Sequence, residues 1–190
     1  MERRRTVTLV GTAVLGALVV VFDYTLKFSG LKIPFPWFPL LKFDFTGIPI
    51  VVSALLYGLP SGATTSAIAF LAILFRSGDL IGPSMKALAE FSTVLGMAPF
   101  IKRTDRTGKA VSLALGLVLR IVTMSLANLI VLPIFYSKYY TFLAAVLFLP
   151  LLGVFNTMQG SISIFGGYLI HEALARRVPS ITNPHQRASA

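Results

Sequence analysis

Long apolar stretches alternate along the chain with short segments that carry charged residues, prolines or glycines. A helix that spans a membrane needs about 20 apolar residues at a rise of about 1.5 Å each. The turn Gly58-Leu59-Pro60 separates two short stretches, and we expect it near one membrane face. We expect six spanning helices, at 6–26, 44–59, 61–76, 83–101, 108–134 and 152–175.

Pro150 and Gly153 interrupt the last apolar region, so we expect a separate short helix at about 140–149 before the sixth span. The pattern as a whole predicts an all-α integral membrane fold with six transmembrane helices. In this interpretation residues 1–178 form one transmembrane domain, and residues 179–190 form a polar C-terminal tail.

The composition agrees with a chain surrounded by lipid. Of its 190 residues, 55% are hydrophobic and 13% are charged, whereas a soluble domain carries about 25% charged residues. The hydrophobic residues are too many to be buried in a core of this size, so lipid must cover much of the surface. The first apolar run is too long for a signal peptide, and no small-residue cleavage site follows it, so we keep it as the first helix.

The basic residues mark the ends of the predicted helices. The net charge is +10, but these residues do not share one soluble face, and we expect no nucleic-acid partner. They flank apolar stretches, as the positive-inside rule predicts for cytoplasmic ends, so both termini are expected in the cytoplasm. The three groups are Arg3, Arg4 and Arg5; Lys102, Arg103, Arg106 and Lys109; and Arg176, Arg177 and Arg187.

The segment 27–43 is the longest predicted external connection. It contains three prolines and an aromatic group around Trp37, and prolines make a backbone stiff and extended. Its large apolar side chains need a surface to pack on. One interpretation is an aromatic belt at the outer headgroups; the one we favour is a structured lid over an external cavity.

Three amide side chains lie toward the external ends of the last two spans. Asn128 lies in the fifth span, and Asn156 and Gln159 lie in the sixth. A spacing of three places Asn156 and Gln159 on one helix face. The amides predict a polar patch in an outward-facing pocket for a neutral ligand with carbonyls and hydroxyls, or polar contacts between helices.

Ionisable residues within the spans are costly unless they face protein or water. Glu90 follows Lys86 by four residues in the fourth span, so the two can form a local ion pair, or Glu90 can face the same pocket as the amides. Arg120 lies near the middle of the fifth span, and the pattern does not identify its partner.

The sequence offers little to catalysis. It has no cysteine, and two histidines cannot form a metal centre alone, so we expect no metal site. Ser163 and His171 are too far apart along one helix to form a catalytic pair, and no Walker or other nucleotide-binding motif is present. We therefore expect no catalytic residues and no enzyme activity.

Three segments resemble the S components of energy-coupling factor (ECF) transporters, specifically the riboflavin-binding type. They are FPWFPLLKFDFTGIPIVVSALLYGLPSGA (35–63), ANLIVLPIFY (127–136) and FNTMQG (155–160). The resemblance implies a six-helix S-component fold in a prokaryotic plasma membrane. It also implies that the protein is the substrate-binding subunit of an ATP-driven importer, with riboflavin as transported ligand rather than cofactor.

The resemblance also assigns roles to residues. Asn128, Asn156 and Gln159 would contact the polar edge and ribityl chain of riboflavin. Ala13 and Ala17 in the first span would match a small-residue surface that meets the transmembrane coupling subunit (T component), and two ATPase subunits would supply energy. The loop residues Leu40, Leu41, Phe43 and Asp44 would enclose the ring system.

Two positions depart from the family pattern. Gln159 stands where the pattern has lysine, and Glu90 stands where related sequences often have asparagine, so Glu90 is kept among the candidate substrate-binding residues. These departures bear on the identity of the ligand. The alternatives are an S component for another vitamin, such as thiamine or a folate, and a membrane subunit that carries no small molecule.

Overall fold

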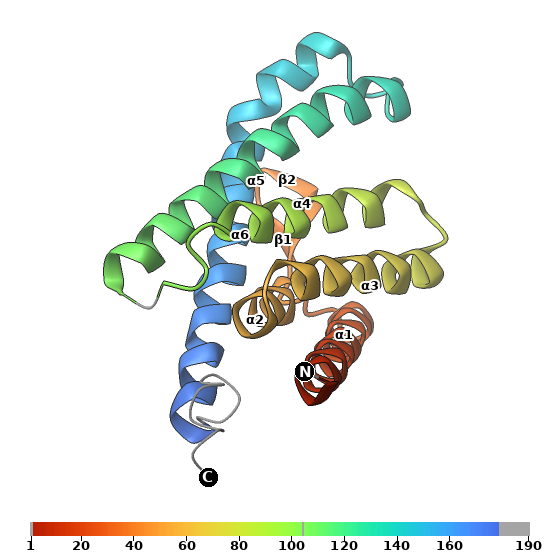
Figure 1. Cartoon of the computed structure of the whole chain (residues 1–190). Coiled ribbons are helices and arrows are strands. Elements are labelled where there is room, and N and C mark those ends of the chain that lie inside the picture. Colours follow the sequence, from red (N-terminus) through yellow and green to blue (C-terminus); the bar gives the residue numbers. More distant parts are fainter. Residues whose placement is uncertain (1, 104, 179–190) are drawn as a thin grey trace.

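The computed structural model describes residues 2–103 and 105–178, without the side chains of residues 2–4, 39 and 40. Within these residues the chain forms six helices and one β-hairpin (Figure 1). The elements in chain order are α1 (Glu2–Phe28), β1 (Ile33–Phe35), β2 (Phe38–Phe43), α2 (Gly47–Tyr57), α3 (Leu59–Ser77), α4 (Ile81–Met97), α5 (Arg106–Phe135) and α6 (Phe142–Arg177).

The six predicted helices are confirmed. Four of the described helices, α1, α3, α5 and α6, are long and apolar enough to cross a membrane. The break between α2 and α3 falls at Gly58, whose positive φ of 91° suits glycine. Helix α2 has 11 residues, most of them buried, and a helix that is apolar on all sides belongs inside a bundle.

The prediction of a separate helix at 140–149 was wrong. Helix α6 runs without interruption from Phe142 to Arg177 and includes Pro150. Proline removes the hydrogen bond to the carbonyl four residues earlier, a cost of about 3 kcal/mol in a helix interior. Packing offsets this cost, because Ala145 and Leu152, on either side of the proline, are buried in one cluster with Leu132 of α5. The tail 179–190 lies outside the described residues.

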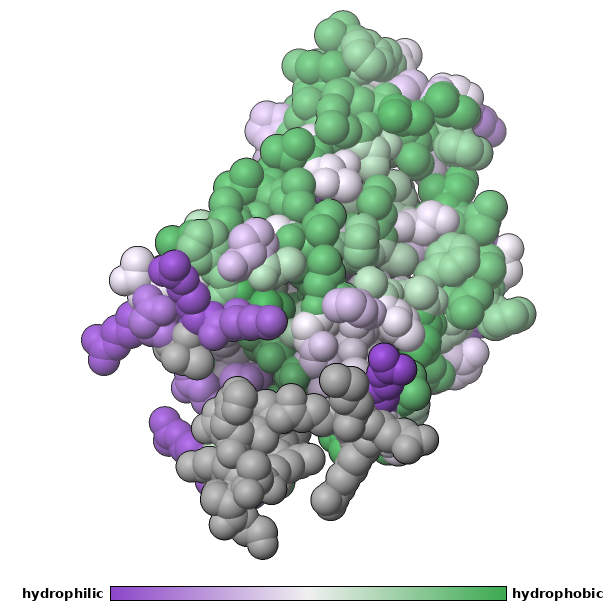
Figure 2. All heavy atoms as spheres, in the orientation of Figure 1, coloured by the Kyte–Doolittle hydropathy of each residue, from purple (hydrophilic) through white to green (hydrophobic). Residues whose placement is uncertain are grey.

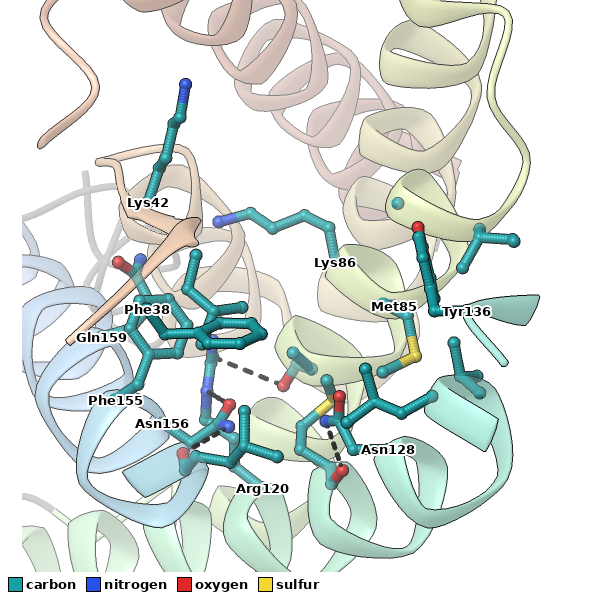
Figure 3. A pocket seen from close by; sticks show the side chains of 18 of the residues that line it. Phe38, Lys42, Met85, Lys86, Arg120, Asn128, Tyr136, Phe155, Asn156 and Gln159 are labelled. Atoms are coloured by element: carbon teal, nitrogen blue, oxygen red, sulfur yellow. Dashed lines mark hydrogen bonds between the residues drawn. The ribbon is translucent and has the colours of Figure 1, made fainter. Parts of the chain in front are cut away.

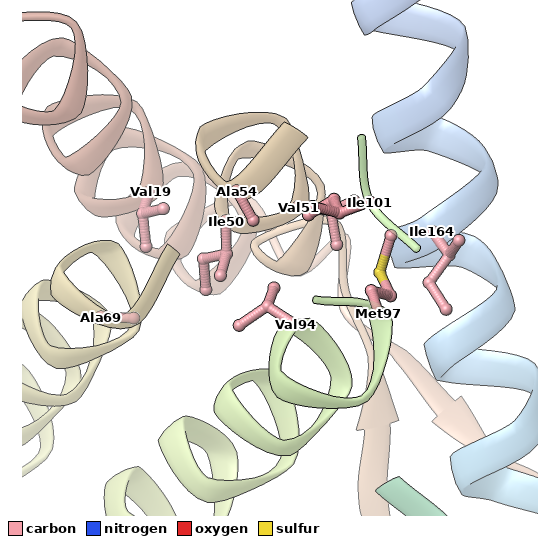
Figure 4. Packing of buried hydrophobic residues seen from close by; sticks show 9 residues of the cluster. All are labelled: Val19, Ile50, Val51, Ala54, Ala69, Val94, Met97, Ile101 and Ile164. Atoms are coloured by element: carbon pink, nitrogen blue, oxygen red, sulfur yellow. The ribbon is translucent and has the colours of Figure 1, made fainter. Parts of the chain in front are cut away.

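The helices pack around α2. Helix α1 packs on α2 and α3, α3 on α4, α4 on α5, α5 on α6, and α6 returns to α2. The central apolar cluster draws on five helices and the segment after α4 (Figure 4): it contains Val19, Ile50, Val51, Ala54, Ala69, Val94, Met97, Ile101 and Ile164.

Helices α4 and α5 approach most closely where Gly96 meets Gly116. A Cβ atom on Gly96 would lie 2.5 Å from the carbonyl oxygen of Leu115 and 2.9 Å from Cα of Gly116. These are backbone atoms that cannot turn aside, so the crossing requires glycine.

The surface is that of a membrane protein. Figure 2 shows apolar residues over most of one face, with hydrophilic residues gathered at the lower left over the α4–α5 connection. Lys102, Arg103 and Arg106 are exposed in that connection. Large side chains such as Leu9, Val122 and Leu147 are exposed on the long helices, where lipid would cover them. The placement of both termini in the cytoplasm stays a prediction.

The segment after α1 folds as an antiparallel hairpin, in which Ile33 pairs with Phe43 and Phe35 with Phe38. Its buried rings, Phe35 and Phe38, join Phe155 of α6 in a second apolar cluster. The stiff segment expected from its prolines therefore has a defined form and a surface to pack on, although the sequence pattern did not predict strands.

Candidate functional site

A cavity of about 260 Å³ lies between the hairpin and helices α4, α5 and α6 (Figure 3). Its wall is mostly apolar and aromatic, with a few polar groups, as is typical of small-molecule sites. Its volume is close to the lower end of the usual range for such sites, roughly 300–1,000 Å³. The apolar lining includes Phe38, Leu41, Ile81, Met85, Met124, Tyr136, Tyr140, Leu152 and Phe155.

The structure brings the three predicted amides to this cavity. Asn128 reaches it from α5, and Asn156 and Gln159 reach it from α6. Each amide is partly engaged within the protein. Asn128 donates from Nδ2 to the carbonyl of Met124 (2.7 Å), and Asn156 donates from Nδ2 to the carbonyl of Leu152 (2.9 Å). Among the described residues, Oδ1 of Asn128 accepts no hydrogen bond, so it can receive one from a ligand.

Gln159 connects α6 to the end of the hairpin. Its Nε2 donates to the carbonyl of Asp44 (2.9 Å), and its Oε1 accepts from the backbone N–H of Asp44 (3.2 Å). Both polar atoms of the amide are therefore used in fixing the backbone that follows β2. A lysine at this position could make only the first of these bonds, because an ammonium group does not accept.

The four predicted loop residues occupy different positions. Leu41 lines the cavity. Phe43 lies outside the lining, with ring centroids 5.0 Å from Phe155 and 5.7 Å from Phe35. Leu40 belongs to β2, and its side chain lies outside the described part of the structure.

Asp44, the fourth predicted loop residue, is buried and anchors the hairpin to α4. It contacts Nζ of Lys86 at 2.6 Å and Nζ of Lys32 at 3.7 Å, and it accepts a hydrogen bond from the hydroxyl of Thr46 (2.7 Å). Burial alone would raise the pKa of this carboxyl, but the two lysines outweigh burial and lower its pKa from 3.8 to about 2. The group is therefore ionised at neutral pH.

The structure identifies the partner of Arg120. One Nη of Arg120 lies 3.1 Å from Oε1 of Glu90, and Lys86 lies 3.3 Å from the same oxygen. The pairing of Glu90 with Lys86 that its spacing allows is present. Glu90 itself is not in the cavity lining, which includes its two partners, Arg120 and Lys86.

Several lining residues were not identified from the sequence. Arg120 was noted only as a buried charge, and the aromatic lining by Tyr136, Tyr140 and Phe155 was not predicted. Phe155 stands next to Asn156 in the FNTMQG segment, and both tyrosines lie in the FYSKYY segment after α5. The position of these aromatic residues close to the candidate amides in the sequence could have indicated that they line the same cavity.

Ala13 and Ala17 lie away from this cavity on an exposed face of α1. The opposite face of the helix is buried through Thr12, Val19 and Asp23. The small residues therefore contribute to a free apolar surface rather than to contacts between the described helices.

The fold defines the class of this protein. It is a multi-pass membrane protein with the fold of an ECF S component. A solved structure of the S component of a bacterial ECF transporter matches it with a TM-score of 0.74 and 22% sequence identity. The match covers 90% of this chain and 97% of that one, so the predicted fold is confirmed.

One curated relative of this chain is a named transporter. The riboflavin transporter FmnP of Bacillus subtilis (strain 168) is 33% identical over 110 residues, which are 54% of this chain and 58% of the relative. The alignment therefore spans a little over half the length of that protein. No family model matches the sequence.

Proposed function

We propose that this protein is the riboflavin-binding S component of an ATP-driven ECF importer in a prokaryotic plasma membrane. In this proposal the cavity under the hairpin captures riboflavin from the outer side. A T component and two ATPase subunits, on separate chains, then drive its release into the cell. The observation that carries the proposal is the mostly aromatic and aliphatic cavity into which three amides project from α5 and α6.

The chemistry of this cavity suits a flat heteroaromatic ligand with a polar chain. Phe38, Tyr140 and Phe155 supply apolar contacts for a ring system. Asn128 supplies a carbonyl oxygen that accepts no other hydrogen bond in the described structure, and an amide nitrogen with a second hydrogen to donate. Such a site offers both donors and acceptors, as ring nitrogens, carbonyls and hydroxyls require.

The relatives support the same proposal. The fold is that of an S component, and the aligned relative is named a riboflavin transporter. The aligned region covers 58% of that relative. A direct binding measurement tests the ligand.

The first experiment measures flavin binding. The protein, purified in mild detergent after expression with riboflavin present, should be yellow and should quench riboflavin fluorescence at one site per chain. A colourless protein that neither quenches added riboflavin nor is stabilised by it would overturn the proposal. Stabilisation by thiamine or a folate instead would favour an S component for another vitamin.

A matched pair of variants tests whether the binding occurs in this cavity. Asn156→Ala should weaken riboflavin binding by about 1–3 kcal/mol, because it leaves buried partners without a hydrogen bond. Thr157→Val is the control, because Thr157 is the next residue on α6 and is not in the cavity lining. Equal affinities in the two variants would remove Asn156 from the site.

A further inference from the structure

Among the described residues, seven charged side chains form one continuous chain of ion pairs that ends at the cavity. Cations and anions alternate along it, and their side chains are between 0 and 17% exposed. Four of the seven are cations and three are anions, so the chain carries one excess positive charge. In order, they are Arg76, Asp23, Lys32, Asp44, Lys86, Glu90 and Arg120.

The two ends of this ion-pair chain differ in their surroundings. Arg76 ends it on α3, where the side chain is 11% exposed. Arg120 ends it at the cavity wall, where the side chain is 2% exposed. Water can hydrate an excess positive charge at Arg76. At Arg120 the molecule that occupies the cavity must stabilise this charge.

The guanidinium of Arg120 is held in place but not saturated. Its Nε donates to Oδ1 of Asn156 (3.2 Å), and one Nη donates to Oγ1 of Thr93 (3.1 Å) beside Glu90. The described residues provide no hydrogen bond or ion pair for its second Nη. Donors of a fixed cation therefore remain for a ligand.

The neighbouring helix leaves room for this arginine. A Cβ atom on Gly160 of α6 would lie 3.0 Å from Cδ and 3.6 Å from Nε of Arg120. The side chain thus passes across α6 at a position without a side chain of its own. This close fit fixes the path of the arginine toward the cavity.

We infer that Arg120 is a specificity-determining residue that selects ligands presenting an electron-rich carbonyl or acidic imide edge to its free donors. This inference rests on the proposed function. In riboflavin the matching group is the dioxopyrimidine end of the ring system, with an imide N–H between two carbonyls. A buried guanidinium beside that edge stabilises negative charge on its oxygens, so binding should make the imide N–H of the flavin more acidic.

The test compares the two ends of the ion-pair chain. Arg120→Gln and Arg76→Gln each remove one positive charge from it, but only the first removes it at the cavity. In Arg120→Gln, Glu90 keeps Lys86 as a partner. The measurements are riboflavin affinity and the pH at which the absorption spectrum of the bound flavin reports loss of the imide proton.

The wild-type protein should lower the imide pKa of bound riboflavin relative to the free vitamin. Arg120→Gln should reduce that shift to what Lys42 and Lys86 of the same lining contribute, and should weaken binding by about tenfold or more, while Arg76→Gln should change neither quantity. Arg120→Lys provides a second measurement if the glutamine variant does not fold. It keeps the charge but loses the planar fork, so it should preserve a lowered imide pKa at reduced affinity.

Two outcomes separate this inference from the proposed function. A wild-type protein that binds no flavin overturns the function itself. A wild-type protein that binds riboflavin, with Arg120→Gln and Arg76→Gln alike in affinity and imide titration, overturns the role of Arg120 and leaves the function standing. The role of Arg120 is also overturned if the imide pKa of bound riboflavin equals that of free riboflavin in both the wild type and Arg120→Lys.

Discussion

At the scale of single residues, the candidate site consists of polar groups that mostly bind one another. Asn156 accepts from Arg120, and Gln159 binds both backbone groups of Asp44. Their first effect is to hold the cavity in shape before a ligand arrives. Such fixed polar groups reduce the ordering cost of binding.

The bond between Gln159 and the hairpin gives a direct prediction. Gln159→Leu keeps the size of the side chain but removes two hydrogen bonds to Asp44. The end of β2 should then loosen, and riboflavin should dissociate about tenfold faster, since orphaned buried partners cost about 1–3 kcal/mol. Stopped-flow fluorescence measures this rate. Met158→Leu, a neighbour outside the cavity lining, should leave it unchanged, and an unchanged rate in Gln159→Leu would contradict the prediction.

The pKa of Asp44 predicts how pH acts on the hairpin. A carboxyl whose pKa falls from 3.8 to about 2 on folding contributes stability that is complete above 3.8 and is lost as pH falls toward 2. Riboflavin affinity should therefore show no step from Asp44 between about pH 5 and about pH 8. Asp44→Asn should bind more weakly throughout that range. A titration step in the wild type near neutral pH that disappears in Asp44→Asn would refute this assignment.

The sequence located part of this site and missed part for a physical reason. Asn128, Asn156 and Gln159 were found because an amide within an apolar span is conspicuous. The pairing of Arg120 with Glu90 was not found, because it joins α4 to α5 and depends on how the two helices are rotated. The hydrogen bond from Arg120 to Asn156 depends likewise on α5 and α6.

At the scale of elements, the hairpin covers the cavity and is held mainly by its rings. Phe35 is fully buried and lies within 5.7 Å, between ring centroids, of Trp37, Phe43 and Phe155. The prolines of this segment indicated an extended backbone. The rings of both strands pack on Phe155, which is distant along the chain, and a local sequence pattern cannot report such a contact.

Removal of the buried ring should release this element. Phe35→Ala should destabilise the packing of the hairpin by about 3–5 kcal/mol, the usual cost of deleting a buried phenylalanine. Backbone amides of 33–43 should then exchange with deuterium faster, while those of α5 keep their protection. Trp37→Ala is the control in the same hairpin, because that side chain is 66% exposed. Equal exchange in the two variants would mean that contacts other than Phe35 hold the hairpin.

Helix α6 shows where a local rule was overridden. Pro150 predicted an end to the helix, and a lone proline does weaken one. In the folded protein Ala145 and Leu152 pack into the same cluster on both sides of it. The contact with α5 therefore supports the helix on both sides of the proline, and the sequence of α6 alone does not contain that contact.

At the scale of the whole molecule, the apolar pattern predicted the six helices and their order. Each helix must either bury its apolar residues in the bundle or expose them to lipid, so each leaves its own pattern in the sequence. The function proposed above requires a surface for other subunits. The exposed face of α1 around Ala13 and Ala17 is flanked by Leu9, Val10, Val14 and Leu18, which are also exposed. Small residues on such a face allow close helix contact.

A bulky side chain on this face should separate binding from transport. Ala13→Trp should leave riboflavin affinity unchanged, because α1 does not line the cavity, and should abolish uptake and co-purification with the coupling subunit. Val122→Trp, at an exposed position of α5, is the matched control and should retain both. Normal uptake by the Ala13→Trp protein would place the docking surface elsewhere.

The crossing of Gly96 and Gly116 also limits how such a carrier can move. Arg120 follows Gly116 by about one helical turn, and Glu90 precedes Gly96 by less than two turns. Backbone atoms touch at that crossing, so α4 and α5 cannot slide past each other without a collision. We therefore expect α4 and α5 to move as one rigid body, which keeps Arg120 and Glu90 together. The ligand would then leave the cavity when the hairpin and α6, which face these two helices, are displaced.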